Sequence, residues 1–174
     1  MPDLTTFFGP TERTVTRSGE RRTVTLSRSY AGTPAELWSA CTDPDRVARW
    51  LGEVAGDRAV GGELRLTMTP PDQDIAVLRI ESCDEPHRLS VGWTWPGEDD
   101  SRVELTLESQ GESTLLTLEH SLVTEATAVT YGYGWEDFLN RLHELLAGRD
   151  PSAVAWSDAE EHLKPLWQMA AENL

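Results

Sequence analysis

One histidine lies where a side chain could take part in proton transfer. The segment STLLTLEHSL, residues 113–122, alternates as a β-strand does and puts Leu116, Leu118 and His120 on one face. An inward-facing histidine could orient a bound molecule or act as a general base in a cyclase- or hydrolase-type reaction. It could equally be a core histidine that is hydrogen-bonded to its neighbours, which is the commoner role. The sequence places no acid beside it, so we assign no catalytic residue.

A group of aromatic residues predicts a hollow with large rings in its wall. In the segment RLSVGWTW, Trp93 and Trp95 are two residues apart, so both rings lie on the strand face that carries Leu89 and Val91. Apolar walls with a few polar tips are typical of small-molecule sites, although such rings can also simply fill a core. Buried indole N–H groups in such a wall would be available to a ligand or a trapped water. The predicted ligand-binding cavity is lined by Trp50, Trp93, Trp95, His120, Tyr133, Trp135 and Phe138.

Arg28 is the candidate polar anchor for a ligand. It follows Val24 and Leu26 on the apolar face of the predicted strand 21–30. Its guanidinium could bind a ligand carboxylate, or it could pair with a nearby acid at the rim of the sheet.

No motif for a metal or another cofactor is present. The segment CDEPH, residues 83–87, holds four potential ligands, but they are too close in sequence for a typical zinc site and resemble a hairpin turn. The sequence contains neither a glycine-rich phosphate loop nor a nucleophile elbow. We therefore expect no metal and no cofactor.

Charge and composition argue against several classes of partner. The 174 residues include 30 acidic and 15 basic ones, and the resulting net charge of −15 disfavours binding to nucleic acid or to an anionic membrane surface. No secretion signal and no apolar stretch of membrane-spanning length is recognisable. Cys41 and Cys83 show no paired spacing, which is typical of free thiols in a cytoplasmic protein. A homodimer is left open.

Two short helices, at about 34–41 and 44–50, must position part of the cavity. Thr33, Pro34 and Glu36 form a capping-box pattern, and Asp43 with the proline after it repeats the start signal. Helices this short are marginal on their own, so tertiary packing must hold them. Trp38 and Trp50 are the expected anchors, and Trp50, at a helix end, is placed where a cavity could open.

The rest of the chain predicts an α+β fold with a curved antiparallel sheet of six or seven strands. Period-two alternation and short connections containing turn residues indicate strands at 12–17, 21–30, 60–70, 75–82, 88–97, 101–109 and 113–122. Apolar residues at helical spacing predict one long helix at 126–147. A second helical pattern follows Asp158, where Pro165 is expected to break or kink the helix.

Five segments taken in order resemble a known family. They are TPAELWSACTDPDRVARWLG, VGGELRL, RLSVGWTW, STLLTLEHSL and YGWEDFLNRLHELLAG. They are similar to homologues of the activator of the heat-shock-protein-90 ATPase, in the START-like, birch-pollen-allergen-like (SRPBCC) superfamily. The resemblance spans about residues 11–150.

This resemblance implies a helix-grip fold, in which the sheet wraps the long C-terminal helix and the two short helices follow the first strands. It implies a START-like domain at residues 1–150 and a helical extension at 151–174 that packs on the same domain. Members share a cavity between sheet and helix, so we expect a protein that binds a small apolar or aromatic molecule. A cyclase- or hydrolase-type enzyme using His120 and a cochaperone-like interaction module are the alternatives.

Overall fold

The computed structural model describes residues 10–68, 74–172 and 174. The last two residues of the strand predicted at 60–70 lie outside these ranges. Eight antiparallel strands form one sheet in the order β1-β2-β8-β7-β6-β5-β4-β3. The strands are β1 (Glu12–Ser18), β2 (Arg21–Ala31), β3 (Gly52–Gly56), β4 (Glu63–Met68), β5 (Ile75–Asp84), β6 (Arg88–Thr94), β7 (Ser101–Gln110) and β8 (Ser113–Thr124).

The strand that the sequence did not predict is β3. It lies at the edge of the sheet and pairs only with β4 among the described strands. Its sequence, GEVAG, has a glycine at each end and no alternation of apolar and polar residues. Gly52 is required by packing, because a Cβ there would lie 2.3 Å from the carbonyl oxygen of Thr67. The expected count of six or seven strands was therefore one too low.

The helices are α2 (Pro34–Thr42), α3 (Pro44–Val47), α4 (Glu125–Leu146) and α5 (Trp156–Ala171). The capping box before α2 is confirmed, since the Glu36 amide donates to the Thr33 hydroxyl and the Thr33 amide donates to the Glu36 carboxylate. Asp43 caps α3 as expected, but α3 is a single turn that ends at Val47 rather than at residue 50.

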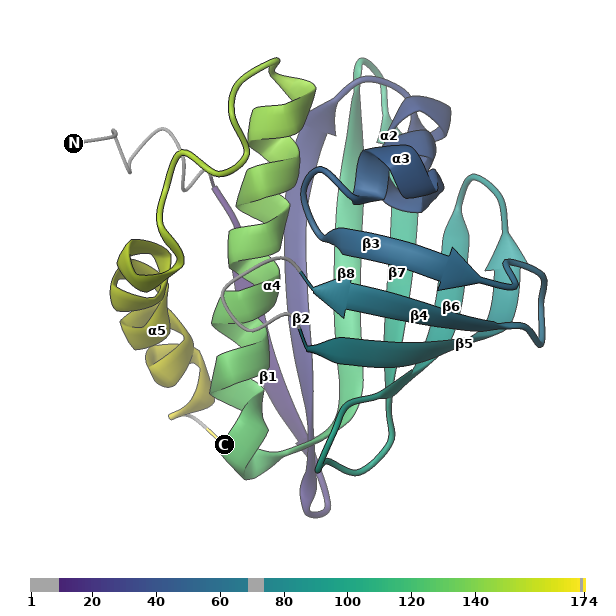
Figure 1. Cartoon of the computed structure of the whole chain (residues 1–174). Coiled ribbons are helices and arrows are strands. Elements are labelled where there is room, and N and C mark those ends of the chain that lie inside the picture. The colour runs from purple at the N-terminus through teal and green to yellow at the C-terminus, as the bar shows by residue number, and fades with distance from the viewer. Residues whose placement is uncertain (1–9, 69–73, 173) are drawn as a thin grey trace.

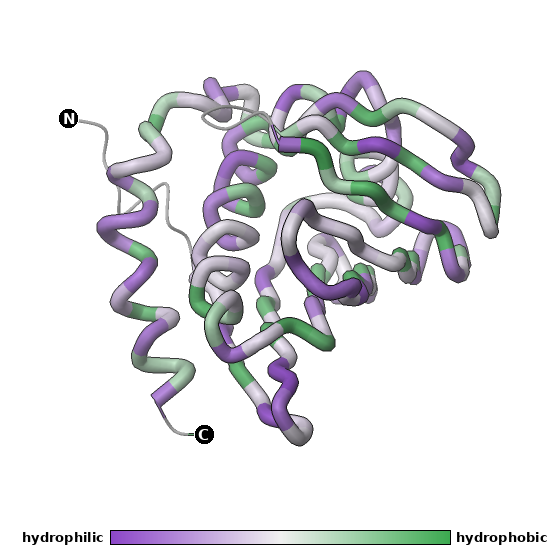
Figure 2. Tube along the Cα trace, turned by 60° about the horizontal axis from the view of Figure 1, so that its bottom comes forward, coloured by the Kyte–Doolittle hydropathy of each residue, from purple (hydrophilic) through white to green (hydrophobic). Residues whose placement is uncertain are grey.

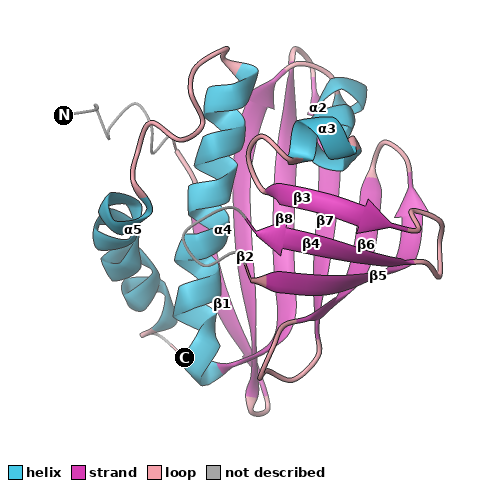
Figure 3. Cartoon of the chain, viewed as in Figure 1, coloured by secondary structure: helices cyan, strands magenta, loops and turns pink. Residues whose placement is uncertain are grey.

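The sheet is strongly curled, and this gives the molecule its layers. In Figure 1, β3, β4 and β5 cross in front of the upright strands β8, β7 and β6. The long helix α4 packs against β2 and β8, whereas α2 contacts β7 and α3 contacts β3 (Figure 3). Hydrophobic and hydrophilic residues alternate along the strands in Figure 2, as a sheet with one dry face requires. The predicted helix-grip fold is confirmed.

The C-terminal helix α5 packs on α4 and β1. Trp167 is fully buried there, and its indole N–H donates to the Glu136 carboxylate of α4 at 2.7 Å. Of the break or kink predicted at Pro165, the break does not occur, because α5 continues through this residue. Pro165 is exposed, so water can satisfy the Glu161 carbonyl that loses its helical N–H partner. The helix also begins before the expected cap at Asp158, with Ala155 as its N-cap residue.

Two glycines of α4 allow a test of how much α5 docking contributes to stability. A Cβ on Gly132 would lie 2.3 Å from the buried ring of Trp167, whereas a Cβ on Gly134 would meet Trp156 at an ordinary 3.7 Å. Gly132→Ala should therefore lower the free energy of unfolding by about 1–3 kcal/mol. Gly134→Ala should raise it by about 0.5–1 kcal/mol, because alanine is the better helix former. Urea unfolding of both variants measures this difference. Equal effects of the two substitutions on the free energy of unfolding would mean that α5 is not held against α4. The predicted boundary at residue 150, between a START-like domain and a helical extension, stays a prediction.

Candidate functional site

An apolar cavity of about 340 Å³ lies between the curled sheet and the short helices. Side chains from α2, α3, strands β3–β8 and the middle of α4 line it. Three of the predicted wall residues, Trp50, Trp93 and Trp135, are among them. The volume falls in the range of about 300–1,000 Å³ that is usual for small-molecule sites. Whether this hollow is the predicted ligand-binding cavity stays a prediction.

The indole rings in this wall have their polar atoms bound elsewhere in the protein. The N–H of Trp50 donates to the Ala40 carbonyl at 3.0 Å, and the N–H of Trp93 donates to the Tyr131 hydroxyl at 3.2 Å. The N–H of Trp135 donates to Nδ1 of His120 at 3.0 Å. We expected the buried N–H groups of Trp93 and Trp95 to be available to a ligand or a trapped water, and for Trp93 this expectation was wrong, because its N–H already donates to Tyr131. These hydrogen bonds fix the orientation of the rings instead, and the rings present only apolar carbon atoms to the cavity.

His120 lies behind this wall rather than in it. Its ring contacts Trp93 edge-on with 5.6 Å between centroids, and it is fully buried. Because an indole N–H can only donate, Nδ1 of His120 must be the acceptor, and Nε2 then donates to the Ser101 hydroxyl at 2.8 Å. Burial lowers the pKa of His120 to about 3. The imidazole is thus neutral near pH 7, with both ring nitrogens hydrogen-bonded, so this structure leaves it no free basic atom.

The other predicted wall residues lie outside the cavity lining. Trp95 stacks on the outer side of Trp93 with an interplanar angle of 3° and centroids 6.2 Å apart. Tyr133 and Phe138 turn toward α5, where their rings lie 6.5 and 5.8 Å from that of Trp156. Their apolar positions on α4 serve the docking of α5. Whether any of these rings binds a ligand stays a prediction.

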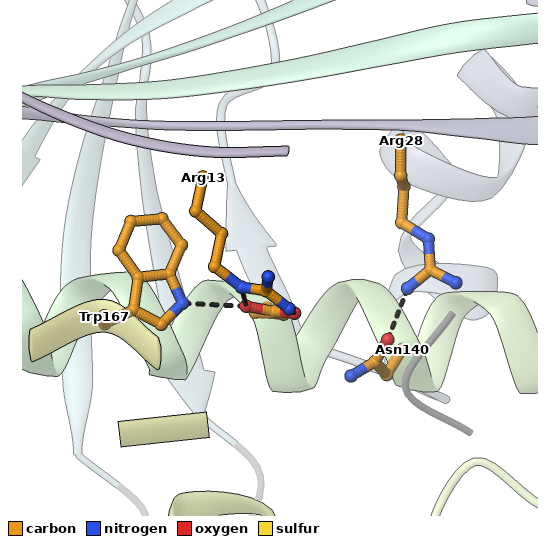
Figure 4. A network of polar contacts seen from close by, with 5 residues as sticks. Arg13, Arg28, Asn140 and Trp167 are labelled. Carbon is orange, nitrogen blue, oxygen red and sulfur yellow. Dashed lines mark hydrogen bonds and ion pairs between the residues drawn. The ribbon is translucent and has the colours of Figure 1, made fainter. Parts of the chain in front are cut away.

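Arg28 is also absent from the cavity lining, and lies in a polar layer between the sheet and α4. Figure 4 shows it reaching from β2 to Asn140 of α4, whose side-chain oxygen accepts from the guanidinium. The guanidinium also lies 5.3 Å from the Tyr30 ring centroid. The role of ligand anchor proposed for Arg28 therefore requires a site other than this cavity.

Sequence reasoning missed several residues of the site. Trp38 and Cys41 line the cavity from one face of α2, and their spacing of three residues could have indicated this. Arg58, Cys83 and Glu85 also line it, and they are exposed, so they mark its mouth. They lie in loops or at a strand end, where no periodic pattern reveals which way a side chain points.

The loop at residues 98–100 is joined to neighbouring elements by polar contacts. Glu98 accepts a short hydrogen bond from the Tyr131 hydroxyl, and Asp99 pairs with Arg21 at 2.8 Å. Burial and the bond to Glu98 raise the pKa of Tyr131, so it stays protonated and can donate to that carboxylate.

Two properties of the described residues bear on the kind of site. These residues bring no three His, Cys, Asp or Glu side chains together in a way that could hold a metal ion. None of their helices has both the length and the apolar character needed to span a bilayer.

A curved antiparallel sheet, short helices at one end and a long C-terminal helix beside a cavity define a START-like protein of the helix-grip fold. The chain belongs to the family of Activator of Hsp90 ATPase homolog 1-like proteins, whose sequence profile matches residues 31–147. The predicted family is thus confirmed.

Solved structures support this assignment. The chain is 35% identical to CalU16 from Micromonospora echinospora, with a TM-score of 0.82 over 94% of this chain and 99% of that one. It is 28% identical to DynU16, a protein of the dynemicin biosynthetic locus, with a TM-score of 0.67 over 74% of this chain and 49% of that one. An HSP90 activator from Plasmodium falciparum shares the fold. It is 21% identical to this chain, with a TM-score of 0.59 over 72% of this chain and 96% of that one. A comparison with curated proteins found no match.

The buried state of His120 predicts a specific dependence of stability on pH. Its pKa is lower in the folded protein than the usual 6.5, so the stability it contributes is complete above pH 6.5 and is lost as the pH falls toward 3. His120→Gln keeps an acceptor and a donor on the side chain but cannot titrate. Between pH 7 and pH 4.5 the wild type should therefore lose more unfolding free energy than the variant, by on the order of 2 kcal/mol.

Urea unfolding at the two pH values measures this difference. Asp137, whose pKa burial raises to about 6, acts in the opposite direction, but it is present in both proteins and cancels. Equal losses in the two proteins would show that His120 is accessible to protons in the folded state.

Proposed function

We propose that this protein binds a small apolar or aromatic molecule in the cavity between the curled sheet and its helices. The observation that carries the proposal is an apolar hollow of about 340 Å³ with three oriented indole rings in its wall. Water in the hollow would find few hydrogen-bond partners on this apolar surface, and an empty hollow would leave it without contacts, whereas a flat apolar ligand would cover it. The physiological ligand is a small molecule rather than nucleic acid or a membrane, in keeping with the net charge of −15.

The relatives support a small-molecule role. DynU16 comes from a biosynthetic locus, and at 28% identity its likeness to this chain is more than a shared fold. On this basis we propose that the ligand of this chain is a product or intermediate of a biosynthetic pathway. The two free cysteines support a cytoplasmic location.

The alternatives have less support. A cyclase or hydrolase that uses His120 as a base would need a free ring nitrogen and a pKa closer to neutrality than about 3. The likeness to the HSP90 activator, at 21% identity, speaks for the fold and carries no cochaperone role. Binding without catalysis is therefore the proposal.

Filling the cavity should abolish binding. Leu105 lines the cavity from β7, while its neighbour Thr106 is exposed on the opposite face of the strand. Leu105→Trp places an indole in the hollow, and Thr106→Trp is the matched control that places one in solvent. Titration with pyrene, followed by its emission, should give saturable binding to the wild type and to Thr106→Trp. Binding to Leu105→Trp should be at least tenfold weaker, although cooperative thermal unfolding is retained.

Two results would contradict the proposal. One is the absence of saturable binding of pyrene, or of any other flat aromatic compound, to the wild type. The other is binding to Leu105→Trp with unchanged affinity, which would place the ligand elsewhere on the molecule.

A further inference from the structure

We propose that Arg58 determines which ligands the cavity accepts, by binding an acidic group that a ligand keeps at the cavity mouth. This inference rests on the proposed function and adds a chemical class to it. The ligand is then an amphipathic molecule, with a flat apolar body inside and one carboxylate or other acidic group at its outer end.

The interior of the cavity gives a ligand little polar guidance. Three of the four indoles in the wall, Trp50, Trp93 and Trp135, donate their N–H groups to protein acceptors. Burial raises the pKa of the Cys41 thiol to about 12, so it remains neutral. Strand residues contribute mainly leucine, isoleucine and valine to the lining. A polar group on a ligand would therefore lose its hydration inside with little in return, and it is driven to the mouth.

The charged side chains that line the cavity lie at its mouth. Among the described residues that line the cavity, only Arg58, Cys83 and Glu85 are exposed, and Arg58 is the one cation. No ion pair joins Arg58 to Glu85 or to any other carboxylate of the described chain. Within the described part of the chain, its guanidinium is thus without a counter-ion at the point where a ligand would leave the cavity.

Arg58 is held in place there by a hydrogen bond. Its NH2 group donates to the carbonyl of Thr42, the last residue of α2, at 3.0 Å. Thr42 also lines the cavity, so Arg58 spans from the β3–β4 connection to the helix at the mouth. This bond uses one of the five N–H groups of the guanidinium, and the others can form the paired bonds that a carboxylate prefers.

The connection that carries Arg58 is itself fixed. The Asp57 carboxylate accepts from the Ala59 amide at 2.9 Å, and the Asp57 amide donates to the Glu63 carbonyl at 3.0 Å. Gly61 and Gly62 exchange backbone hydrogen bonds with Ile80 of β5. Because the loop is already ordered, little conformational entropy is lost when Arg58 binds a ligand group.

Because of Glu85, the proposal also predicts which sign of ligand charge the mouth prefers. A carboxylate at the same mouth repels an acidic ligand and attracts a basic one, so the two side chains favour opposite ligands. Arg58 should dominate, because a guanidinium is weakly hydrated and meets a carboxylate with two parallel bonds. The sign of the preference can be measured.

The experiment compares three pyrene probes: neutral pyrene, 1-pyrenebutyrate and 4-(1-pyrenyl)butylamine. Arg58→Gln should weaken pyrenebutyrate binding about three- to tenfold, as for a partly exposed charge pair, and leave pyrene binding within twofold. The matched control is Arg65→Gln, which changes the net charge equally but lies exposed on β4 between the lining residues Leu64 and Leu66. It should change neither affinity. Arg58→Lys keeps the positive charge but lacks the two parallel N–H groups of the guanidinium, so it should retain part of the preference for pyrenebutyrate over pyrene. Glu85→Gln should strengthen pyrenebutyrate binding.

The outcomes separate the two proposals. If pyrene binds but pyrenebutyrate affinity is unchanged in Arg58→Gln, or falls equally in Arg65→Gln, the role of Arg58 is refuted while the cavity function stands. Tighter binding of the amine than of the carboxylate by the wild type would also refute it. If no probe binds to the wild type, both proposals fall. Thermal unfolding of each variant shows whether the lost bond to Thr42 has altered the fold.

Discussion

A single helix is too narrow to cover an eight-stranded sheet, and the rest of the structure follows from this mismatch. An α-helix with its side chains is about 10–12 Å wide. Eight strands at about 4.8 Å spacing extend over roughly 34 Å. Here α4 lies over β2 and β8, so the remaining apolar face must be covered in another way. The sheet curls until β3–β5 cross the upright strands, and α2 and α3 close the end (Figure 1). The cavity is the volume that these covers do not fill.

The opposite side of α4 is stabilised by buried polar contacts in addition to apolar packing. Glu136 is fully buried, and it accepts from Arg13 of β1 and from Trp167 of α5, so one carboxylate joins three elements. Removing either partner would leave a buried charge short of hydrogen bonds, which is strongly destabilising. Arg141 likewise binds Asp137 and the carbonyls of Pro151 and Val154, and so holds the α4–α5 connection. With the helix anchored on this side, an unfilled hollow on the other can be tolerated despite its energetic cost.

The sequence predicted the elements that have a periodic pattern of apolar residues. It did not predict features that depend on how distant elements pack together. Alternation located seven strands, and family resemblance supplied the helix-grip arrangement, but β3 carries no alternation to detect. Trp50 and Trp93 line the hollow, and for Trp93 the strand face decides this direction. Phe138 lies against Trp156 instead, because α4 is covered on two sides and the sequence does not show which side receives α5. The burial of Glu136 was unforeseen for the same reason: a polar residue on a helix is normally exposed until another element covers it.

The second layer behind the cavity wall explains why the aromatic residues are tryptophans. Trp93 and Trp135 are fixed by Tyr131 and His120, and these in turn bond to Glu98 and Ser101. A phenylalanine in either position would fill similar space but could not be oriented by a hydrogen bond. The network therefore sets each ring before any ligand arrives, which lowers the entropy lost on binding. It also consumes the polar atoms of these two side chains. The interior of the cavity then selects ligands by their shape and apolar contact. Selection by the charge of the ligand can arise at the mouth, where Arg58 and Glu85 are exposed to solvent.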